Sequence, residues 1–499
     1  MPTLSALVRA GASALRVAAA AAALIALAPA AGMAQTAGEP LPGSLPTPRP
    51  AAPTPASVIT RSPSHYLGSV PAGEATADEI PLTLADAIAR GLASNLGAID
   101  ADLDLRLADA QRERTLAALL PQLAGRLHHQ TGEISLVQFG FTLPGVPTII
   151  GPFSYQDARI GLTQQLFNVQ DVESWRAARE SARAAQWNRD DSRDTVVLAV
   201  GAGYYQVAAS MARVETAEAQ LKGSRALDEL AVNQVKNGLS PAIDQLRARV
   251  QAQTDEQRVA VARAQLEKDK LSLARLIGLP LGQRFRVTGE AAYLPWSGPA
   301  AEDALKTAYA SRHDLKSAAA LLHAAELARS AAAGERVPTV GLSADYGRIG
   351  KNLARTDGTF TVAADVSVPL FTGGRTAAAV AAAQASLDRR KAELADLRSR
   401  VDYEVRSAFL DLRAAETSVE VAKKNIELAR QALEQAEDRF KNGVTGNVEV
   451  VLAEEAVAAA NENYIASLFS HNFSKLALLK AMGLIESGVR QYFETTGGK

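Results

Sequence analysis

Two acidic residues stand at matching places in the two halves of the sequence, and their spacing makes them candidates for a functional role. Asp244 follows Gly238 by six residues, and Glu449 follows Gly443 by the same distance. A carboxylate at such a place can attract cations, or it can simply stabilise the positive end of the helix that begins there. The residues around the two acids do not decide between these roles.

Composition excludes several kinds of chemistry. The chain of 499 residues has no cysteine, which excludes disulfides, a thiol nucleophile, cysteine-ligated metals and lipidation on cysteine. Its six histidines show no HExxH spacing, and neither a Walker A nor a GxSxG motif occurs. A net charge of -1 excludes a strongly basic nucleic-acid-binding surface as the organising feature of the protein. We therefore expect a protein that is not an enzyme, with no cofactor, no metal centre and no nucleic-acid partner.

The first 34 residues have the pattern of a secretory signal peptide. Arg9 and Arg16 precede an apolar run over 17–28, and small residues at 32 and 34 precede Gln35. The run is shorter than the roughly 20 residues of a membrane-spanning helix, and no later stretch of that length is continuously apolar. We therefore expect an exported chain that can cross a membrane only as a closed β-barrel.

From residue 81 onward the sequence contains an internal duplication, in which one unit occurs twice. Leu120-Pro121 recurs as Val337-Pro338, and Leu166-Phe167 recurs as Leu370-Phe371, at offsets of about 204 to 217 residues. The expected organisation is a signal peptide at 1–34, a proline-rich linker at 35–80, a first repeat at 81–290, a second repeat at 291–486 and a C-terminal tail at 487–499.

Each copy predicts a helix, two strands, a long helix, a turn and a returning helix. Pro121 and Pro338 should end the incoming helices and open strands. Apolar and polar residues alternate over 340–346 and 360–368, and Ile160, Leu162 and Leu166 form the corresponding apolar line in the first copy. Four strands are too few to close a barrel, so several chains must contribute.

The apolar segment 139–153, with its glycines and prolines, is expected to be the first interstrand loop. An ordinary buried loop, a lipid-facing segment and a segment that packs between chains are all consistent with its composition.

Residues 375–441 contain no proline and predict one helix of roughly 100 Å. Apolar residues at a three-four spacing from Val405 to Phe440 form a heptad seam, and a second apolar line from Leu410 to Ala432 lies beside it. Two adjacent seams suit a helix between two neighbours in a tube, but a bundle within one chain would bury both equally well.

The turns after the long helices share a glycine that suits a left-handed C-cap, at Gly238 and Gly443. Ser240 and Thr445 follow two residues later and are expected to cap the returning helices.

These features together resemble the TolC-type outer-membrane efflux family. The resemblance covers nearly all of residues 80–486 and depends on the duplication, the two strand-opening prolines, the junctions at 165–167 and 369–374, and the turn motifs at 236–240 and 440–445. It implies an α+β fold, mainly α, in which a homotrimer forms an outer-membrane β-barrel continued by a long periplasmic α-helical coiled-coil tube. It also implies contact with outer-membrane lipid.

The function implied by the resemblance is a passive export conduit of a tripartite efflux or type I secretion system. Such a conduit docks on a periplasmic adaptor protein that is served by an inner-membrane pump. The adaptor-docking residues that carry over are Gly238, Leu239, Ser240, Gly443, Val444 and Thr445. The substrate and the pump class (RND, ABC or MFS) stay open.

The pore constriction and gate carry over less completely. Glu449 matches a constriction aspartate, Asp244 matches a gate-network aspartate, and Phe440 matches a gate tyrosine without its hydroxyl. Leu452 replaces a second pore aspartate and Thr445 replaces a gate arginine, so the resemblance implies a different or weaker closed-state latch.

The alternative interpretation is a periplasmic coiled-coil scaffold without a pore. Alternating strands with a polar face favour the channel.

Overall fold

The computed structural model describes residues 66–140, 145, 147–288, 293–352 and 354–493, so the predicted signal peptide lies outside the described residues. These residues form two compact units, each of which is described by itself. The first comprises 111–178 and 327–384, and the second comprises 66–110, 179–326 and 385–493, apart from the gaps above.

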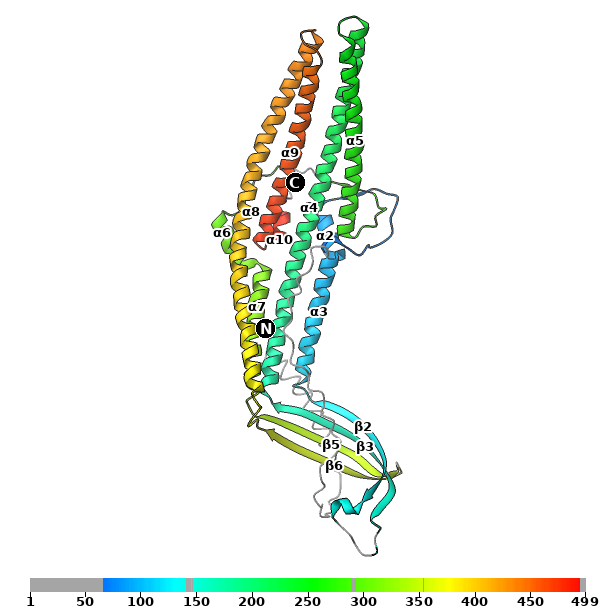
Figure 1. The fold of residues 1–499 in the computed structure, drawn as a ribbon, viewed down its shortest axis with the longest axis vertical. Helices are drawn as coiled ribbons and strands as arrows, with labels where there is room; N and C mark the ends of the chain where they lie inside the picture. Colours follow the sequence, from blue (N-terminus) through cyan, green and yellow to red (C-terminus); the bar gives the residue numbers. More distant parts are fainter. Residues whose placement is uncertain (1–65, 141–144, 146, 289–292, 353, 494–499) are drawn as a thin grey trace, which may run out of the picture. The chain divides into compact units, whose positions relative to one another are not determined.

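The first unit is built on a four-stranded antiparallel sheet (Figure 1). Its strands, in the spatial order β2-β3-β5-β6, are β2 (Gln122–Ser135), β3 (Ile149–Phe167), β5 (Thr339–Asn352) and β6 (Arg355–Ser367). β2 and β5 begin directly after Pro121 and Pro338, which confirms the predicted strand starts. The outer strands of this sheet are β2 and β6.

The register of the sheet separates an apolar face from a polar face. Tyr346 lies opposite Ile160 on β3 and Phe360 on β6, while the next residue, Asp345, lies opposite Gly161 and Thr361. Residues directly opposite each other in antiparallel strands share a face. The predicted alternation is therefore confirmed: apolar residues line one face, and aspartate and threonine line the other.

Two expectations for the first hairpin need correction. The register shifts between Gln165 and Phe167, so that Phe167, and not Leu166, lies opposite Val340 on the apolar face. The predicted loop 139–153 is also too long, because β3 already begins at Ile149 and a short 3-10 helix, η2 (Leu136–Phe139), precedes it. Residues 141–144 and 146 lie outside the described residues.

One arginine on the polar face joins three strands. Arg159 on β3 pairs through Nε with Asp157 Oδ2 at 2.7 Å and through Nη1 with Asp345 on β5. Its Nη2 also donates a hydrogen bond to Thr359 Oγ1 on β6, at 3.1 Å. A single guanidinium thus neutralises two carboxylates and fixes the order of β3, β5 and β6.

The second unit contains most of the four long helices, α4 (Val169–Lys236), α5 (Ala242–Ile277), α8 (Arg375–Lys441) and α9 (Val448–Ala481). Figure 1 shows α4 beside α5 and α8 beside α9, as two helical hairpins. The shorter elements are α2 (Leu84–Ser94), α3 (Leu96–Ala117), α6 (Ala301–Ser311), α7 (His313–Gly334), α10 (Ile485–Phe493) and the parallel pair β1 (Ile80–Leu82) and β4 (Phe285–Val287). The order α2-α3-β2-β3-α4-α5 recurs as α6-α7-β5-β6-α8-α9, as the duplication predicts.

Helix α8 has the predicted bounds and buries the predicted seam. Val405, Leu412, Val419 and Phe440 are all buried. The second apolar line is exposed in the single chain, including Leu410, Val421 and Leu428. The described part of one chain therefore provides a partner for only one of the two seams.

The core of the second unit joins both repeats. Val196, Val197 and Val200 on α4 are buried in a cluster with Leu273 on α5 and Leu476 on α9. This part of α4 lies in a charge-free stretch, 195–212. Among the described residues α4 alone is long and apolar enough to cross a membrane, and half of its most apolar window is buried. The expectation that no stretch after the signal peptide is long and apolar enough to cross a membrane is therefore not met by α4.

Both ends of the described chain are more ordered than expected. Tyr66 packs against the core and its backbone oxygen accepts a hydrogen bond from Asn95 Nδ2, so the predicted linker stops before 66 and not at 80. In the predicted tail, residues up to 493 are helical and Val489 is buried. Lys475 Nζ donates to the backbone oxygen of Tyr492 at 3.0 Å. The boundary between the repeats stays a prediction, since 289–292 lie outside the described residues.

We expect Arg159→Gln to weaken the sheet, because Asp157 and Asp345 then both lose the cation that neutralises them. The loss should be about 1–3 kcal/mol. It should appear as an earlier loss of the folded band when samples are heated before electrophoresis in mild detergent. Arg126→Gln is the matched control, since Arg126 is exposed and lies directly opposite Arg159 on β2. Equal melting of the two variants would contradict this role for Arg159.

Candidate functional site

The turn at the end of each helical hairpin has the same backbone geometry. Gly238 N–H donates to Val235 O at 3.0 Å and Leu239 N–H donates to Gln234 O at 2.8 Å, with Gly238 at φ +72°. These two bonds are the Schellman motif that satisfies the last carbonyls of a helix. We call the residues 234–244 and 439–449 the first and second tips.

The second tip repeats this pattern. Gly443 N–H donates to Phe440 O at 3.0 Å and Val444 N–H donates to Arg439 O at 2.9 Å, with Gly443 at φ +69°. No atom of the described residues lies within 4 Å of a Cβ added at either glycine, so a side chain would have room there. The left-handed backbone is therefore what favours glycine at these two positions. In both tips the next residue, Leu239 or Val444, is exposed, by 73% and 66%.

The returning helices are not capped as predicted. The N-cap of α5 is Pro241 and that of α9 is Asn447, and neither side chain caps its helix. Ser240 Oγ donates instead to Gln234 Oε1 across the first tip, at 3.2 Å. Thr445 Oγ1 is buried and has no hydrogen-bond partner in the described part of the chain.

Asn447 connects the second tip to the first. It is fully buried, and its Nδ2 donates a hydrogen bond of 2.6 Å to the backbone oxygen of Asp244. Asparagine immediately before a helix normally serves as its N-cap, so the sequence offers a signal for a cap at this residue but none for a bond to the other hairpin. The two tips are therefore joined by a bond between α5 and the start of α9.

Phe440 is the largest buried side chain at this end of the helices. It is 1% exposed and packs in one cluster with residues from all four long helices: Leu227, Ala231, Ala248, Ala436 and Val450. This position makes Phe440 a core residue that holds the two hairpins together. Its role in a gate stays a prediction.

Asp244 and Glu449 lie in the first turns of α5 and α9, but their surroundings differ. The Asp244 side chain is 5% exposed and lies 3.6 Å from Arg247 Nη1. The Glu449 side chain is 47% exposed and lies 3.5 Å from Arg439 Nε across the turn. Glu449 is thus the acid that solvent and ions can reach, and Arg439 is a neighbour that the sequence pattern did not reveal.

A second acidic group lies deeper between the hairpins. Glu454 on α9 faces Gly223 on α4: a Cβ added to Gly223 would lie 3.6 Å from the Oε1 atom of Glu454. The Oε2 atom of Glu454 is buried and has no hydrogen-bond partner among the described residues. Burial, together with the negative charges of Asp255 and Glu437, raises the pKa of Glu454 to about 7. Asp255 itself pairs with Arg258 Nη1 at 3.0 Å.

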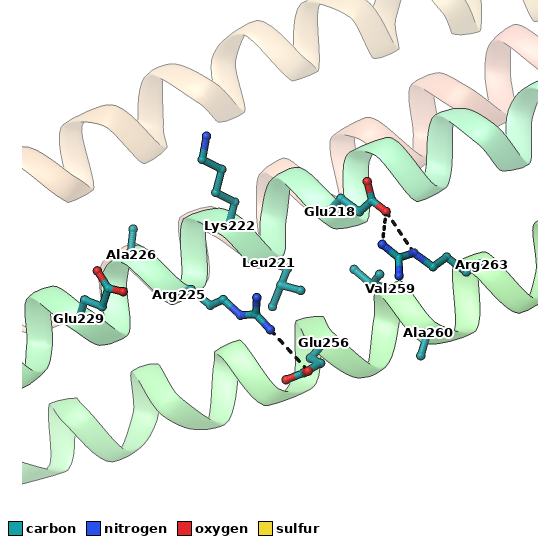
Figure 2. Close-up of a pocket in the computed structure, with 10 residues that line it drawn as sticks. All are labelled: Glu218, Leu221, Lys222, Arg225, Ala226, Glu229, Glu256, Val259, Ala260 and Arg263. Carbon is teal, nitrogen blue, oxygen red and sulfur yellow. Dashed lines mark hydrogen bonds and ion pairs between the residues drawn. The ribbon is translucent and has the colours of Figure 1, made fainter.

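A groove of about 640 Å³ lies between α4 and α5 (Figure 2). Arg263 donates through Nε and Nη2 to Glu218 Oε1, at 3.1 and 2.6 Å, and Arg225 lies 3.4 Å from Glu256. Figure 2 shows both arginine–glutamate pairs spanning the two helices. Leu221 and Val259 provide apolar lining between the charges.

Among the described residues no group of three or more histidine, aspartate or glutamate side chains is placed to hold a metal ion.

Comparison with known proteins identifies the family. The sequence model of the outer membrane efflux proteins matches residues 90–279 and 304–484, one match in each repeat. The chain belongs to the outer membrane efflux protein family. The resemblance and the fold class inferred from the sequence are confirmed.

Individual relatives and solved structures agree with this assignment. The outer membrane efflux protein BepC of Brucella suis is 24% identical over 422 residues, which are 83% of this chain and 88% of that protein. VceC of Vibrio cholerae matches with a TM-score of 0.70 at 21% identity, over 80% of this chain and 96% of that one. The open state of MtrE of Neisseria gonorrhoeae matches with a TM-score of 0.69 at 19% identity, over 83% and 95%.

Family membership places the protein in the outer membrane and makes it an export channel and not an enzyme. In this channel fold the tips are the ends of the helical hairpins, and Asp244, Glu449 and Phe440 all lie within them. Sequence reasoning missed Asn447, Arg439 and Glu454. A heptad pattern records which residues face a partner helix, but not which polar side chain reaches across to it.

We expect Gly238→Ala and Gly443→Ala each to destabilise a tip, because alanine in the left-handed region costs about 1 kcal/mol or more. The change should appear as faster tryptic cleavage at Lys236 or Lys441 with an unchanged sheet. Gly446→Ala is the control, since its φ is not positive and its Cβ would make an ordinary contact of 3.8 Å with Asp244. Equally fast cleavage in all three variants would show that the glycine conformation is not the cause.

We also expect Glu454→Gln to change how stability depends on pH. The folded pKa of about 7 lies above the ordinary value of 4.5, so the contribution of Glu454 to stability is fully present below about pH 4.5 and is lost as pH rises through 7. The variant should therefore melt at a higher temperature than the wild type at pH 8, and this advantage should vanish at pH 5. Glu449→Gln, at an exposed acid, should keep the wild-type profile. Parallel profiles for Glu454→Gln and the wild type would refute this account.

Proposed function

We propose that this chain is the outer-membrane conduit of a tripartite efflux or type I secretion system. Three copies form a twelve-stranded barrel and a helical tube, and the tips dock on a periplasmic adaptor protein. The observation that carries the proposal is the four-stranded sheet with one apolar and one charged face and two open edges.

The trimer is supported by what one chain leaves unfinished. The strands β2 and β6 each have one neighbour in the sheet, and an unpaired edge is too costly in hydrocarbon. The same argument holds for the helices: on the exposed second seam of α8, Leu410, Val421 and Leu428 need a neighbour that the described part of the chain does not supply. A periplasmic scaffold would require no sheet with an apolar face, so the channel is the better interpretation.

Docking through the tips is supported by their exposed apolar residues. Leu239 and Val444 project from turns that the Schellman motif fixes, so a partner would meet them without having to order the loop first. The groove between α4 and α5 starts about 10 Å from the first tip, at 1.5 Å per residue from Lys236 to Glu229. A helical hairpin of an adaptor could contact Leu239 and continue along this groove toward the ion pairs.

The pore entrance is supported by the contrast between the two acids. Around a threefold axis each Glu449 would face two copies of itself, and a ring of exposed carboxylates attracts cations. Leu452, where family members carry a second acid, leaves this ring to dominate the local field. Asp244 is buried and paired with Arg247, so it contributes less to the potential in the pore.

We therefore expect Glu449→Gln to reduce the cation preference of single channels in planar bilayers and to weaken block by divalent cations. Arg439→Gln should have the opposite effect, because it removes the positive charge 3.5 Å from Glu449. Asp244→Asn is the matched control and should change selectivity least. A collapse of selectivity in Asp244→Asn with none in Glu449→Gln would place the constriction at the first tip, and no conductance in any preparation would refute the channel.

A further inference from the structure

One charged residue lies on the apolar face of the sheet. Arg348 on β5 stands directly opposite Ala158 on β3 and Gly358 on β6. It follows Tyr346 by two residues, so it shares the face of Tyr346, Ile160 and Phe360 and not the face of Asp345. This face meets lipid if the barrel forms as proposed, and an arginine there requires an explanation.

The depth of Arg348 places it at the edge of the hydrocarbon. The apolar residues of β5 begin at Val340, eight residues earlier. At about 3.3 Å per residue and a tilt of 35–45°, this separation corresponds to about 20 Å along the membrane normal. The apolar band of such barrels is about 25 Å tall, so the guanidinium reaches the headgroup level.

The end of the sheet at which Arg348 lies follows from chain connectivity. β5 starts after α7 and ends at the turn to β6, near 352–355, so Arg348 lies toward the end of the sheet opposite the strand ends that α7 and α8 join. With the helices in the periplasm, this is the outer leaflet. Lys351 and Arg355 are exposed near the same turn and add positive charge there.

The Arg348 side chain is held in place by hydrogen bonds that do not use all of its N–H donors. Arg348 Nε donates to Thr356 Oγ1 and Nη2 donates to Thr356 O, both at 2.9 Å. Within the described residues no acceptor is bonded to Nη1. Thr356 therefore orients a guanidinium that still has donors to offer, in a place where water is scarce and phosphate oxygens are abundant.

We propose that Arg348 binds a phosphate group of an anionic outer-leaflet lipid, so that the assembled barrel carries one such site per chain. This inference depends on the proposed barrel. Charge-assisted hydrogen bonds from a guanidinium to phosphate are short and directional, and arginine suits them better than lysine. The bound lipid would stabilise the sheet around β5 and β6, and with it the assembled barrel.

The test uses the purified full-length protein in detergent, melted with and without diphosphoryl lipid A. The readout is the temperature at which the trimer band disappears on a gel. Lipid A should raise this temperature by a few degrees in the wild type, and Arg348→Gln should lose at least half of that rise. Arg348→Lys should keep an intermediate rise. Arg126→Gln, on the opposite face, should keep the full rise.

Two further additions identify the ligand. Dephosphorylated lipid A should give little stabilisation, and inorganic phosphate at the same concentration should give none. An equal rise in the wild type and Arg348→Gln, or an equal rise with dephosphorylated lipid, would overturn the assignment. If the wild type forms conducting trimers but shows either of these results, only this inference fails. If the wild type forms no trimer at all, the proposed function fails with it.

Discussion

A strand edge in lipid must be paired, and this constraint explains more of the protein than any other. β2 and β6 each have a neighbour on one side only, and every backbone group left unpaired in hydrocarbon costs several kcal/mol. One chain is therefore an incomplete object in a membrane, whatever its internal stability. Helix α8 is incomplete in the same sense, because it buries one apolar seam against its own chain and leaves a second apolar seam exposed.

Contacts within the chain define the parts that an assembly would use. Arg159 fixes three strands of the sheet through two carboxylates and a threonine. Phe440 gathers the four long helices, and Asn447 joins the two tips through the backbone of Asp244. The tips can therefore present Leu239, Val444 and Glu449 in fixed positions, while the buried Glu454 makes the neighbouring part of the helical hairpins respond to pH.

Features that depend on periodicity could be predicted from the sequence. The bounds of α8, the starts of β2 and β5 and the two faces of the sheet follow from proline positions and from repeats of two or seven residues. Where one extra residue breaks the period, prediction failed, as at the bulge that puts Phe167 in the place expected for Leu166.

Features that depend on a neighbouring element could not be predicted in this way. Ser240 and Thr445 have the right type for helix caps, but Pro241 and Asn447 occupy the N-cap positions and Asn447 bonds across to α5. The pairing of Arg439 with Glu449 and the burial of Phe440 likewise arise only when the helices are placed side by side. The site residues were found by resemblance, whereas their environments required the structure.

The central claim is that β6 of one copy pairs with β2 of the next until three copies close the barrel. Because the chain has no cysteine, introduced thiols report this contact without background. Ala124→Cys on β2 can be combined in turn with Thr359→Cys, Thr361→Cys or Ala363→Cys on β6. These positions share the polar face but are separated by two strands within a chain, roughly 14 Å, which is too far for a disulfide. Oxidation in native membranes should give covalent dimers and trimers and nothing larger. Oxidised samples in which every pair stays monomeric, or in which the ladder continues beyond three chains, would contradict the account.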